Sequence, residues 1–255
     1  MHVLNPTRQM RCAVAVIWFC IVPFASQAGE DGRVRERAAM VETILDYARV
    51  DPALTGEDAI AENVLDAMAQ TKRHLFVSKD RARFAYADRP LPIGHGQTIS
   101  QPYIVALMTH LARLPANATV LEIGTGSGYQ AAILARVAKK VCTIEIIPEL
   151  GERARSTLRN LGYDNVGVRI GDGYQGWPEC GPFDAVIVTA ALGHVPPRLM
   201  EQLKDGGRLV MPVGEPGATQ LLTVVEKSAS GKTTTREAGR VRFVPFTRPP
   251  EQGRE

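Results

Sequence analysis

Residues 120–129 read VLEIGTGSGY, and this run determines the fold class of the chain. Four residues typical of a buried strand come first, with a single acid at Glu122, and glycines follow at 124, 126 and 128. An apolar pattern with helical spacing opens directly after them, at Tyr129. Glycines allow a tight turn and let a ligand lie directly on the backbone near a helix N-terminus. The run therefore predicts a strand, a ligand-binding turn and a helix.

The segments that follow alternate between strand and helix patterns. Strands are expected at 119–123, 141–146, 166–170, 184–189 and 208–213, and helices at 129–137, 148–161 and 197–203. Two later β segments, 220–225 and 241–246, flank a polar turn at 227–232 without a helix between them, so we expect them to pair antiparallel at the sheet edge. The pattern predicts a doubly wound, Rossmann-like α/β fold with a mostly parallel seven-stranded sheet.

The chain before this region has helical patterns. Apolar spacing predicts helices over 33–47, after Thr55 or Asp58, and over 103–114, with a loop rich in charge, Gly and Pro between the last two. The core is therefore expected to carry an N-terminal helical extension.

The first 28 residues resemble an export signal. Arg8 and Arg11 precede an apolar run at 12–24, and small residues at 26–28 suit a cleavage site. The run is shorter than the roughly 20 residues that a membrane span needs. Translation from a downstream start such as Met40 is the alternative, in which case the leader is never made.

Charge and cysteine content exclude several classes of function. The net charge is +3, and residues 1–40 carry five arginines against three acids, so the remaining chain is nearly neutral. Such a body offers no footprint for a phosphate backbone, and we expect no nucleic-acid partner. The four cysteines (12, 20, 142 and 180) form no CxxC or Cys/His cluster, so no metal is expected. Cys142 is expected to be a buried free thiol and Cys180 a loop thiol.

The glycine-rich turn indicates the cofactor. Its spacing is GxGxG rather than the GxGxxG of dinucleotide sites. Glu122, two residues before the first glycine, would repel a pyrophosphate but can hold an ammonium group, directly or through water. A ligand with an ammonium group and no phosphate matches S-adenosyl-L-methionine.

Two further strand ends support this cofactor. Glu145 ends the second strand, where a carboxylate can accept both ribose hydroxyls, and Asp172-Gly173 ends the third, near the expected adenine edge. The predicted cofactor-binding residues are Glu122, Gly124, Thr125, Gly126, Ser127, Gly128, Glu145, Ile146, Asp172 and Gly173.

The acceptor of the methyl group is indicated by the segment before the turn. No Asn/Asp-Pro-Pro-aromatic stretch, typical of amino methylation on nucleic acid, follows the fourth strand. Residues 91–103 read LPIGHGQTISQPY, and here the chain resembles the protein-L-isoaspartate (D-aspartate) O-methyltransferases, which methylate age-damaged aspartyl and asparaginyl sites. The resemblance covers about residues 73–246. It includes the motifs at 121–130, 171–173, 183–185, 188–191 and 242–245.

The resemblance implies a class I S-adenosylmethionine-dependent methyltransferase that acts on damaged proteins and peptides containing isoaspartyl residues. It implies that Ser100 is the active-site serine, and that the substrate pocket is lined by Gln97, Thr98, Ile99 and Ser100. It also implies a cytoplasmic enzyme, and we expect a monomer. The chain then divides into a leader (1–28), a helical extension with the substrate loop (29–100) and the cofactor-binding core (101–250).

Several alternatives stay open at this point. Ser100 precedes a helix and suits an N-cap, a role compatible with an active-site one. His95 is expected to be a polar loop residue, and His194 stands where the family resemblance suggests an acid. A cofactor-binding module without turnover, or a methyltransferase for another carboxylate, would share much of this sequence. Export through residues 1–28 is the alternative to a cytoplasmic location.

Overall fold

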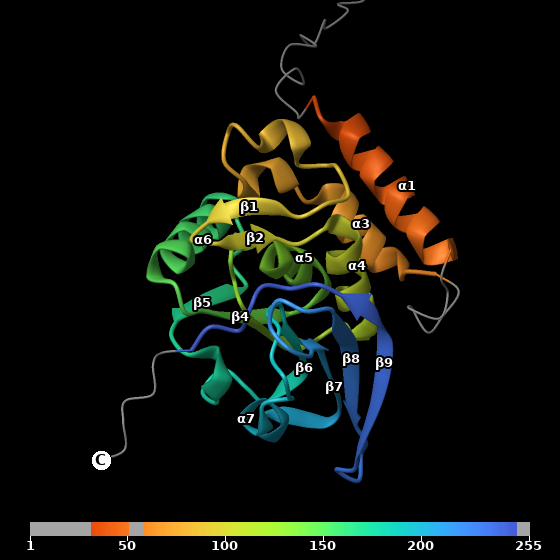
Figure 1. Ribbon diagram of the computed structural model, residues 1–255, viewed down its shortest axis with the longest axis vertical. Helices are drawn as coiled ribbons and strands as arrows, with labels where there is room; N and C mark the ends of the chain where they lie inside the picture. The colour runs from red at the N-terminus through yellow and green to blue at the C-terminus, as the bar shows by residue number, and fades with distance from the viewer. Residues whose placement is uncertain (1–31, 51–58, 249–255) are drawn as a thin grey trace, which may run out of the picture. The chain divides into compact units, whose positions relative to one another are not determined.

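A computed structural model describes residues 32–50 and 59–248, in which a seven-stranded sheet carries the glycine-rich turn. The strands are β3 (Thr119–Ile123), β4 (Lys140–Glu145), β5 (Val166–Ile170), β6 (Phe183–Val188), β7 (Leu203–Val213), β8 (Gln220–Lys227) and β9 (Thr233–Val241). Their order is β5-β4-β3-β6-β7-β8-β9; the first five are parallel, and β8 is antiparallel to both of its neighbours (Figure 1). The predicted fold class, with its antiparallel edge, is confirmed.

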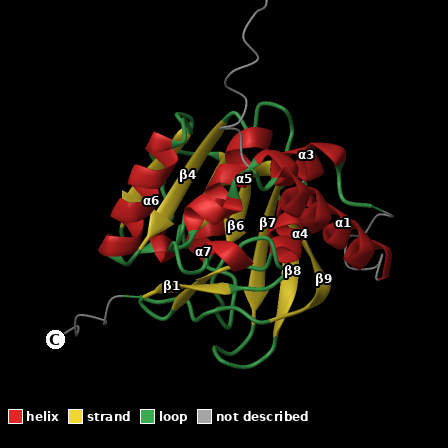
Figure 2. Ribbon diagram, turned by 90° about the horizontal axis from the view of Figure 1, so that it is seen from above, coloured by secondary structure: helices red, strands yellow, loops and turns green. Residues whose placement is uncertain are grey.

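The helices are α1 (Val34–Val50), α3 (Glu62–Gln70), α4 (Pro102–Leu111), α5 (Tyr129–Val137), α6 (Pro148–Asn160) and α7 (Pro197–Glu201). In Figure 2, α6, α5, α4 and α1 follow one another across the view. Nine of the ten residues of α4 are buried, because this helix lies between the sheet and the pair α1 and α3. A helix that is apolar on all sides is expected in such a position.

The strands bury alternate residues in two separate cores. Val120 and Ala185 pack with α4, α5 and α6 on one face of the sheet. Leu121 and Val186, the next residues along the same strands, pack with α7 and the segment before β6 on the other face. Successive side chains of a strand point to opposite faces, so a near-continuous apolar run is what a sheet covered on both sides requires.

The loop before α4 contains a two-stranded hairpin that the sequence did not predict. Strand β1 (Leu91–Gly94) pairs antiparallel with β2 (Gln97–Ile99). The turn between them has three consecutive left-handed residues, with φ of 94°, 54° and 70° at Gly94, His95 and Gly96. His95 is exposed at this tip, as expected of a polar turn residue. The hairpin fixes the position of the residues just before α4.

The last strand was placed wrongly by the sequence. The edge strand is β9, Thr233–Val241, and not 241–246. Its residues are mostly polar and exposed, because an edge strand is stabilised by its ladder with β8 and need not bury an apolar face. The apolar residues 243–246 instead run past the end of β6, where Val244 and Phe246 are hydrogen-bonded to Ala191. Strand β7 also begins earlier than predicted, at Leu203, directly after α7 ends at Glu201.

The expectation of two free thiols is also wrong, because Cys142 and Cys180 form a disulfide. Cys142 lies on β4 and points to the sheet face that the segment before β6 covers. Cys180 belongs to that segment, so the two Cα atoms lie 6.6 Å apart, although 38 positions separate them in the sequence. Only the folded sheet brings the pair together.

The leader at 1–28, with Cys12 and Cys20, and the helix start at Thr55 or Asp58 lie outside the described residues. Helix α3 begins at Glu62. Within residues 32–50 and 59–248, every helix is too short or too polar to cross a bilayer.

Candidate active site

The turn after β3 is held in a conformation that requires glycine. Gly124, Gly126 and Gly128 have φ of 95°, 52° and 86°, in the left-handed region that side chains rarely adopt. A Cβ atom on Gly124 would lie 2.5 Å from the Thr189 hydroxyl oxygen. That hydroxyl lies 2.8 Å from the carbonyl oxygen of Gly124, to which it donates a hydrogen bond. The turn is therefore packed against the end of β6.

Glu122 is fully buried, and neither of its carboxylate oxygens has a hydrogen-bond partner among the described residues. Burial, more than the nearby charge of Glu145, raises the pKa of Glu122 from 4.5 to about 8. The neighbouring Thr143 hydroxyl opposes this shift, but it is bonded at 2.6 Å to the hydroxyl of Thr125. A buried carboxyl without a partner indicates a ligand that supplies a positive charge or a donor.

Glu145 ends β4 and holds the backbone of the turn. One carboxylate oxygen accepts the Gly126 N–H at 2.7 Å, and the other accepts the Ile147 N–H at 3.0 Å. Each carboxylate oxygen has two lone pairs, so both keep a free site for a hydroxyl donor. This geometry is compatible with the predicted contact to a ribose, and it holds the side chain at the pocket that Glu145 lines.

The third strand end contributes through its glycine. Gly173 lines the pocket, whereas Asp172 does not. One Asp172 oxygen accepts the Tyr174 N–H at 2.9 Å, and the other lies 3.7 Å from Nε of Arg248. In the described structure this carboxylate therefore shapes the turn after β5 rather than facing the pocket.

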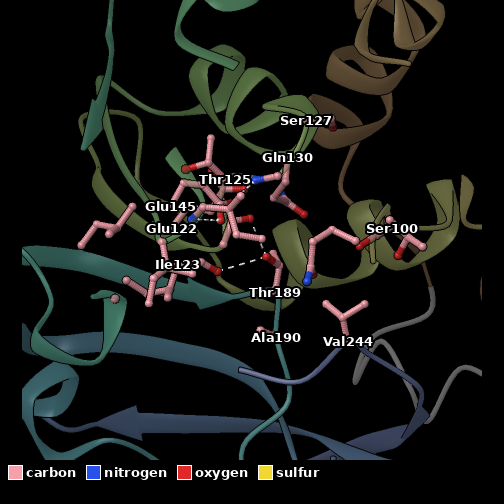
Figure 3. A pocket seen from close by; sticks show the side chains of 18 of the residues that line it. Ser100, Glu122, Ile123, Thr125, Ser127, Gln130, Glu145, Thr189, Ala190 and Val244 are labelled. Atoms are coloured by element: carbon pink, nitrogen blue, oxygen red, sulfur yellow. Dashed lines mark hydrogen bonds between the residues drawn. The ribbon is translucent and has the colours of Figure 1, made fainter. Parts of the chain in front are cut away.

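The four predicted substrate residues, Gln97 to Ser100, all line the same pocket. Figure 3 shows Ser100 at one side of the pocket, with Glu122 and Glu145 at the other. Ser100 does not cap α4, because Gln101 occupies the N-cap position without a side-chain bond. Asp88 does this work instead, accepting the Tyr103 N–H at 2.8 Å and the Gln101 amide at 2.6 Å. The Ser100 hydroxyl has no hydrogen bond to a described residue and is available to a ligand.

Several pocket residues were not predicted. They are Val105, Ile123, Tyr129, Gln130, Ile144, Ile147, Thr189, Ala190 and residues 244–247. Val244 is brought in by two hydrogen bonds of 2.8 Å that Ala191 makes with the C-terminal segment, one through its N–H to the Val244 carbonyl and one from the Phe246 N–H. Gln130 is buried with its side-chain oxygen unpartnered. Of the predicted cofactor residues, Gly128 and Asp172 do not line the pocket.

Aromatic and basic side chains stand at the rim beside Gly173. The ring of Tyr174 lies under the guanidinium of Arg248, 4.1 Å from its carbon, and its hydroxyl lies 3.1 Å from Nε2 of His194. His194 is exposed, so the residue that departs from the family resemblance is a surface contact of the rim and not part of the pocket lining.

The pocket matches the chemistry of S-adenosyl-L-methionine. It offers an unpartnered buried carboxyl for an ammonium group, hydroxyl-accepting sites on Glu145, and a bare glycine backbone at 124 and 126. Among the described residues, no group of three or more His, Cys, Asp or Glu side chains is placed to hold a metal ion.

Comparison with known proteins also indicates a methyltransferase. The family model described as "Protein-L-isoaspartate(D-aspartate) O-methyltransferase (PCMT)" matches residues 54–251. A protein-L-isoaspartate O-methyltransferase of Syntrophobacter fumaroxidans is 53% identical over 220 residues, which are 86% of this chain and 89% of that protein. A solved protein-L-isoaspartate O-methyltransferase has a TM-score of 0.72 and 28% identity over 82% of this chain and 65% of its own. A Plasmodium falciparum protein solved with S-adenosyl-L-homocysteine shares the fold, with a TM-score of 0.65 and 22% identity over 81% of this chain and 97% of its own.

Proposed function

The chain belongs to the protein-L-isoaspartate(D-aspartate) O-methyltransferase family, and we propose how its residues carry out the family's reaction. The protein is a methyltransferase that uses S-adenosyl-L-methionine as methyl donor. It esterifies the free carboxylate of L-isoaspartyl residues in damaged proteins and peptides, with D-aspartyl residues as a second substrate to be tested. The observation that carries this function is the placement of residues 97–100 and of the cofactor-binding turn in one pocket.

The cofactor half of the pocket binds by charge and by close backbone approach. We assign the ammonium group of the donor to Glu122, the ribose hydroxyls to Glu145, and the adenine edge to the backbone at Gly173. A substituent on Gly124 would collide with the Thr189 hydroxyl and displace the turn, so the glycine keeps the backbone in the position that the ligand requires. The bound cofactor supplies an electrophilic methyl group on a sulfonium.

The acceptor half of the pocket needs no general base. The side-chain carboxyl of an isoaspartyl residue forms the peptide bond, so its free group is the α-carboxyl, which is already ionised near neutral pH. One of its oxygens can attack in line, forming an O–CH3 bond as the S–CH3 bond breaks. The Ser100 hydroxyl donates to the non-attacking oxygen and fixes the direction of the attacking one. Ile99 and Val244 exclude water around the two reactants, and removal of their solvent shells favours a step in which both charges disappear.

The product is a methyl ester and neutral S-adenosyl-L-homocysteine. The neighbouring backbone nitrogen of the substrate then attacks the ester and expels methanol, giving a succinimide that hydrolyses in part to normal aspartate. No residue of the enzyme is required for this second stage.

Substitution of Ser100 tests these assignments. With radiolabelled donor and peptides that differ only in an aspartyl or isoaspartyl linkage, we expect base-labile labelling of the isoaspartyl peptide alone. Ser100→Ala should lower kcat by about ten-fold or more, since a hydrogen bond to a charged group is worth about 1.5–3 kcal/mol, and should leave S-adenosyl-L-homocysteine affinity unchanged. Ser156→Ala, on the exposed surface of α6, is the matched control. Cofactor binding without transfer to either peptide would show a binding module or another acceptor.

We also propose that the enzyme acts as a monomer in the cytoplasm, where its cofactor is made, and without a nucleic-acid partner. The Cys142–Cys180 disulfide favours the alternative of export through residues 1–28, because disulfides persist mainly in oxidising compartments. Fractionation of cells expressing the full chain, with the N-terminal residue of the recovered protein identified, decides between the two.

A further inference from the structure

A second cavity adjoins the methyl-transfer pocket and carries positive charge. Its volume is about 400 Å³, within the range of ligand-binding clefts. It shares Thr98, Ser100, Thr189 and Val244 with the pocket described above, so the two are continuous at the acceptor end. We call it the arginine groove, after Arg240 and Arg242, which line it together with Pro90, Gln101, Ile104, Thr219, Val241 and Phe243.

The side chains of the two arginines make no polar contact within the described part of the chain. Arg240 is near the end of the edge strand β9 and Arg242 follows it, and both are exposed. Neither guanidinium group has an ion pair or hydrogen bond to a residue in 32–50 or 59–248. Two unpaired guanidinium groups on one wall suit a partner with negative charge, because guanidinium binds carboxylates in a bidentate manner.

No acid among the described residues lines the groove to compete for these arginines. The nearest carboxylate in sequence is Asp88, which is bonded through both oxygens to Gln101 and to the backbone of Tyr103. A substrate chain that extends from the acceptor end of the pocket into the groove therefore meets hydroxyl, apolar and cationic side chains, and no acidic one from the described residues.

We propose that the arginine groove holds the peptide segment beside the isoaspartyl residue and selects for acidic side chains within about three positions of it. The proposal rests on the function proposed above, since a protein substrate whose carboxylate enters the pocket must continue along an adjoining surface. Arg240 and Arg242 are then specificity-determining residues, which act on the flanking sequence and not on the reacting atoms.

The test compares isoaspartyl peptides that differ only in their flanking residues, which are glutamates, glutamines or lysines. One series of three peptides carries these residues on the N-terminal side of the isoaspartyl residue, and a second series carries them on the C-terminal side. We expect the glutamate peptide of at least one series to exceed the lysine peptide in kcat/KM by about three- to ten-fold, because exposed ion pairs contribute modestly. The ratio should shrink as ionic strength rises from about 0.05 to 0.5 M.

Charge reversal of the groove should abolish or invert this order. In the double variant Arg240→Glu, Arg242→Glu, the ratio of kcat/KM for the glutamate peptide to kcat/KM for the lysine peptide should fall to one or below. Unchanged affinity for S-adenosyl-L-homocysteine shows that the variant is folded. Arg236→Glu is the matched control, since this residue lies on the same strand but does not line the groove, and its ratio should equal that of the unmodified protein. Equal kcat/KM for all flanks, or a preference that survives reversal of both arginines, overturns the proposal. Absence of methyl transfer to every isoaspartyl peptide would instead refute the proposed function.

Discussion

Replacement of Glu122 by Gln tests the electrostatics of the cofactor end. Burial places the pKa of Glu122 at about 8, against 4.5 for an ordinary glutamate. In the absence of a ligand, the folded protein therefore keeps a proton that the unfolded chain releases between pH 4.5 and 8. Each pH unit in that window lowers the free energy of unfolding by about 1.4 kcal/mol, so Glu122 costs about 3 kcal/mol at pH 7 and almost nothing below pH 4.5. Glutamine preserves the shape of the side chain and does not titrate.

The assay is urea unfolding of the ligand-free protein at pH 5, 6, 7 and 8. Stability of the Glu122→Gln variant relative to the unmodified protein should increase by about 3 kcal/mol over that range, since all other titrating groups are shared. Glu42→Gln, at an exposed position on α1, is the control and should give a constant difference. Parallel stability curves for the unmodified protein and Glu122→Gln would refute the buried, protonated carboxyl.

The same residue predicts how cofactor binding depends on protons. An ammonium group beside Glu122 favours the ionised carboxylate, so binding of S-adenosyl-L-homocysteine near pH 7 should release a proton. Calorimetry in two buffers of different ionisation enthalpy measures that release directly. In Glu122→Gln the release should disappear and the affinity should fall at least ten-fold, consistent with the loss of a charged hydrogen bond worth about 1.5–3 kcal/mol. Unchanged affinity in the variant would exclude Glu122 as the ammonium site.

Two further predictions concern the scaffold. Gly124→Ala should destabilise the protein by at least 1 kcal/mol more than Gly231→Ala in thermal unfolding, and it should abolish cofactor binding in calorimetry. Both glycines have positive φ, but only a Cβ atom on Gly124 would collide with Thr189. Reduction of the Cys142–Cys180 disulfide, which closes a loop of 38 residues, should lower the free energy of unfolding by about 2–4 kcal/mol in urea titrations, and a Cys142→Ser, Cys180→Ser variant should show no response to the reductant.

The sequence predicted features whose cause is local. Glu122, Glu145 and the glycines at 124–128 lie at or next to strand ends. The carboxyl ends of parallel strands meet at one edge of the sheet, so the sequence was enough to predict that these residues form one site. Features that depend on contacts between distant segments could not be predicted. Thr189 lines the pocket because its hydroxyl is bonded to the Gly124 carbonyl, 65 positions away in the sequence. Val244 was assigned to a strand because its neighbours are apolar, whereas hydrogen bonds to Ala191 hold it across the pocket.

The case of Ser100 shows how a local rule can mislead. A serine just before a helix suits an N-cap, yet Asp88 caps α4 from 15 positions upstream of Tyr103. The cap therefore leaves the Ser100 hydroxyl free, and the sequence alone offers no pattern that separates these two arrangements.

Charge is distributed along the site in a way that suits both reactants and products. The acids that line the cofactor end are Glu122 and Glu145, and none among the described residues lines the arginine groove beyond the acceptor end. Glu145, joined by Glu122 once the bound ammonium has displaced its proton, attracts the cationic groups of the cofactor at one end, and a substrate carboxylate is not repelled from the other. Methyl transfer removes the charge of the sulfonium and of the carboxylate together, so the electrostatic attraction that assembled the reactants is weaker for the ester and S-adenosyl-L-homocysteine. The same arrangement that favours assembly of the charged pair therefore also favours release of the neutral ester.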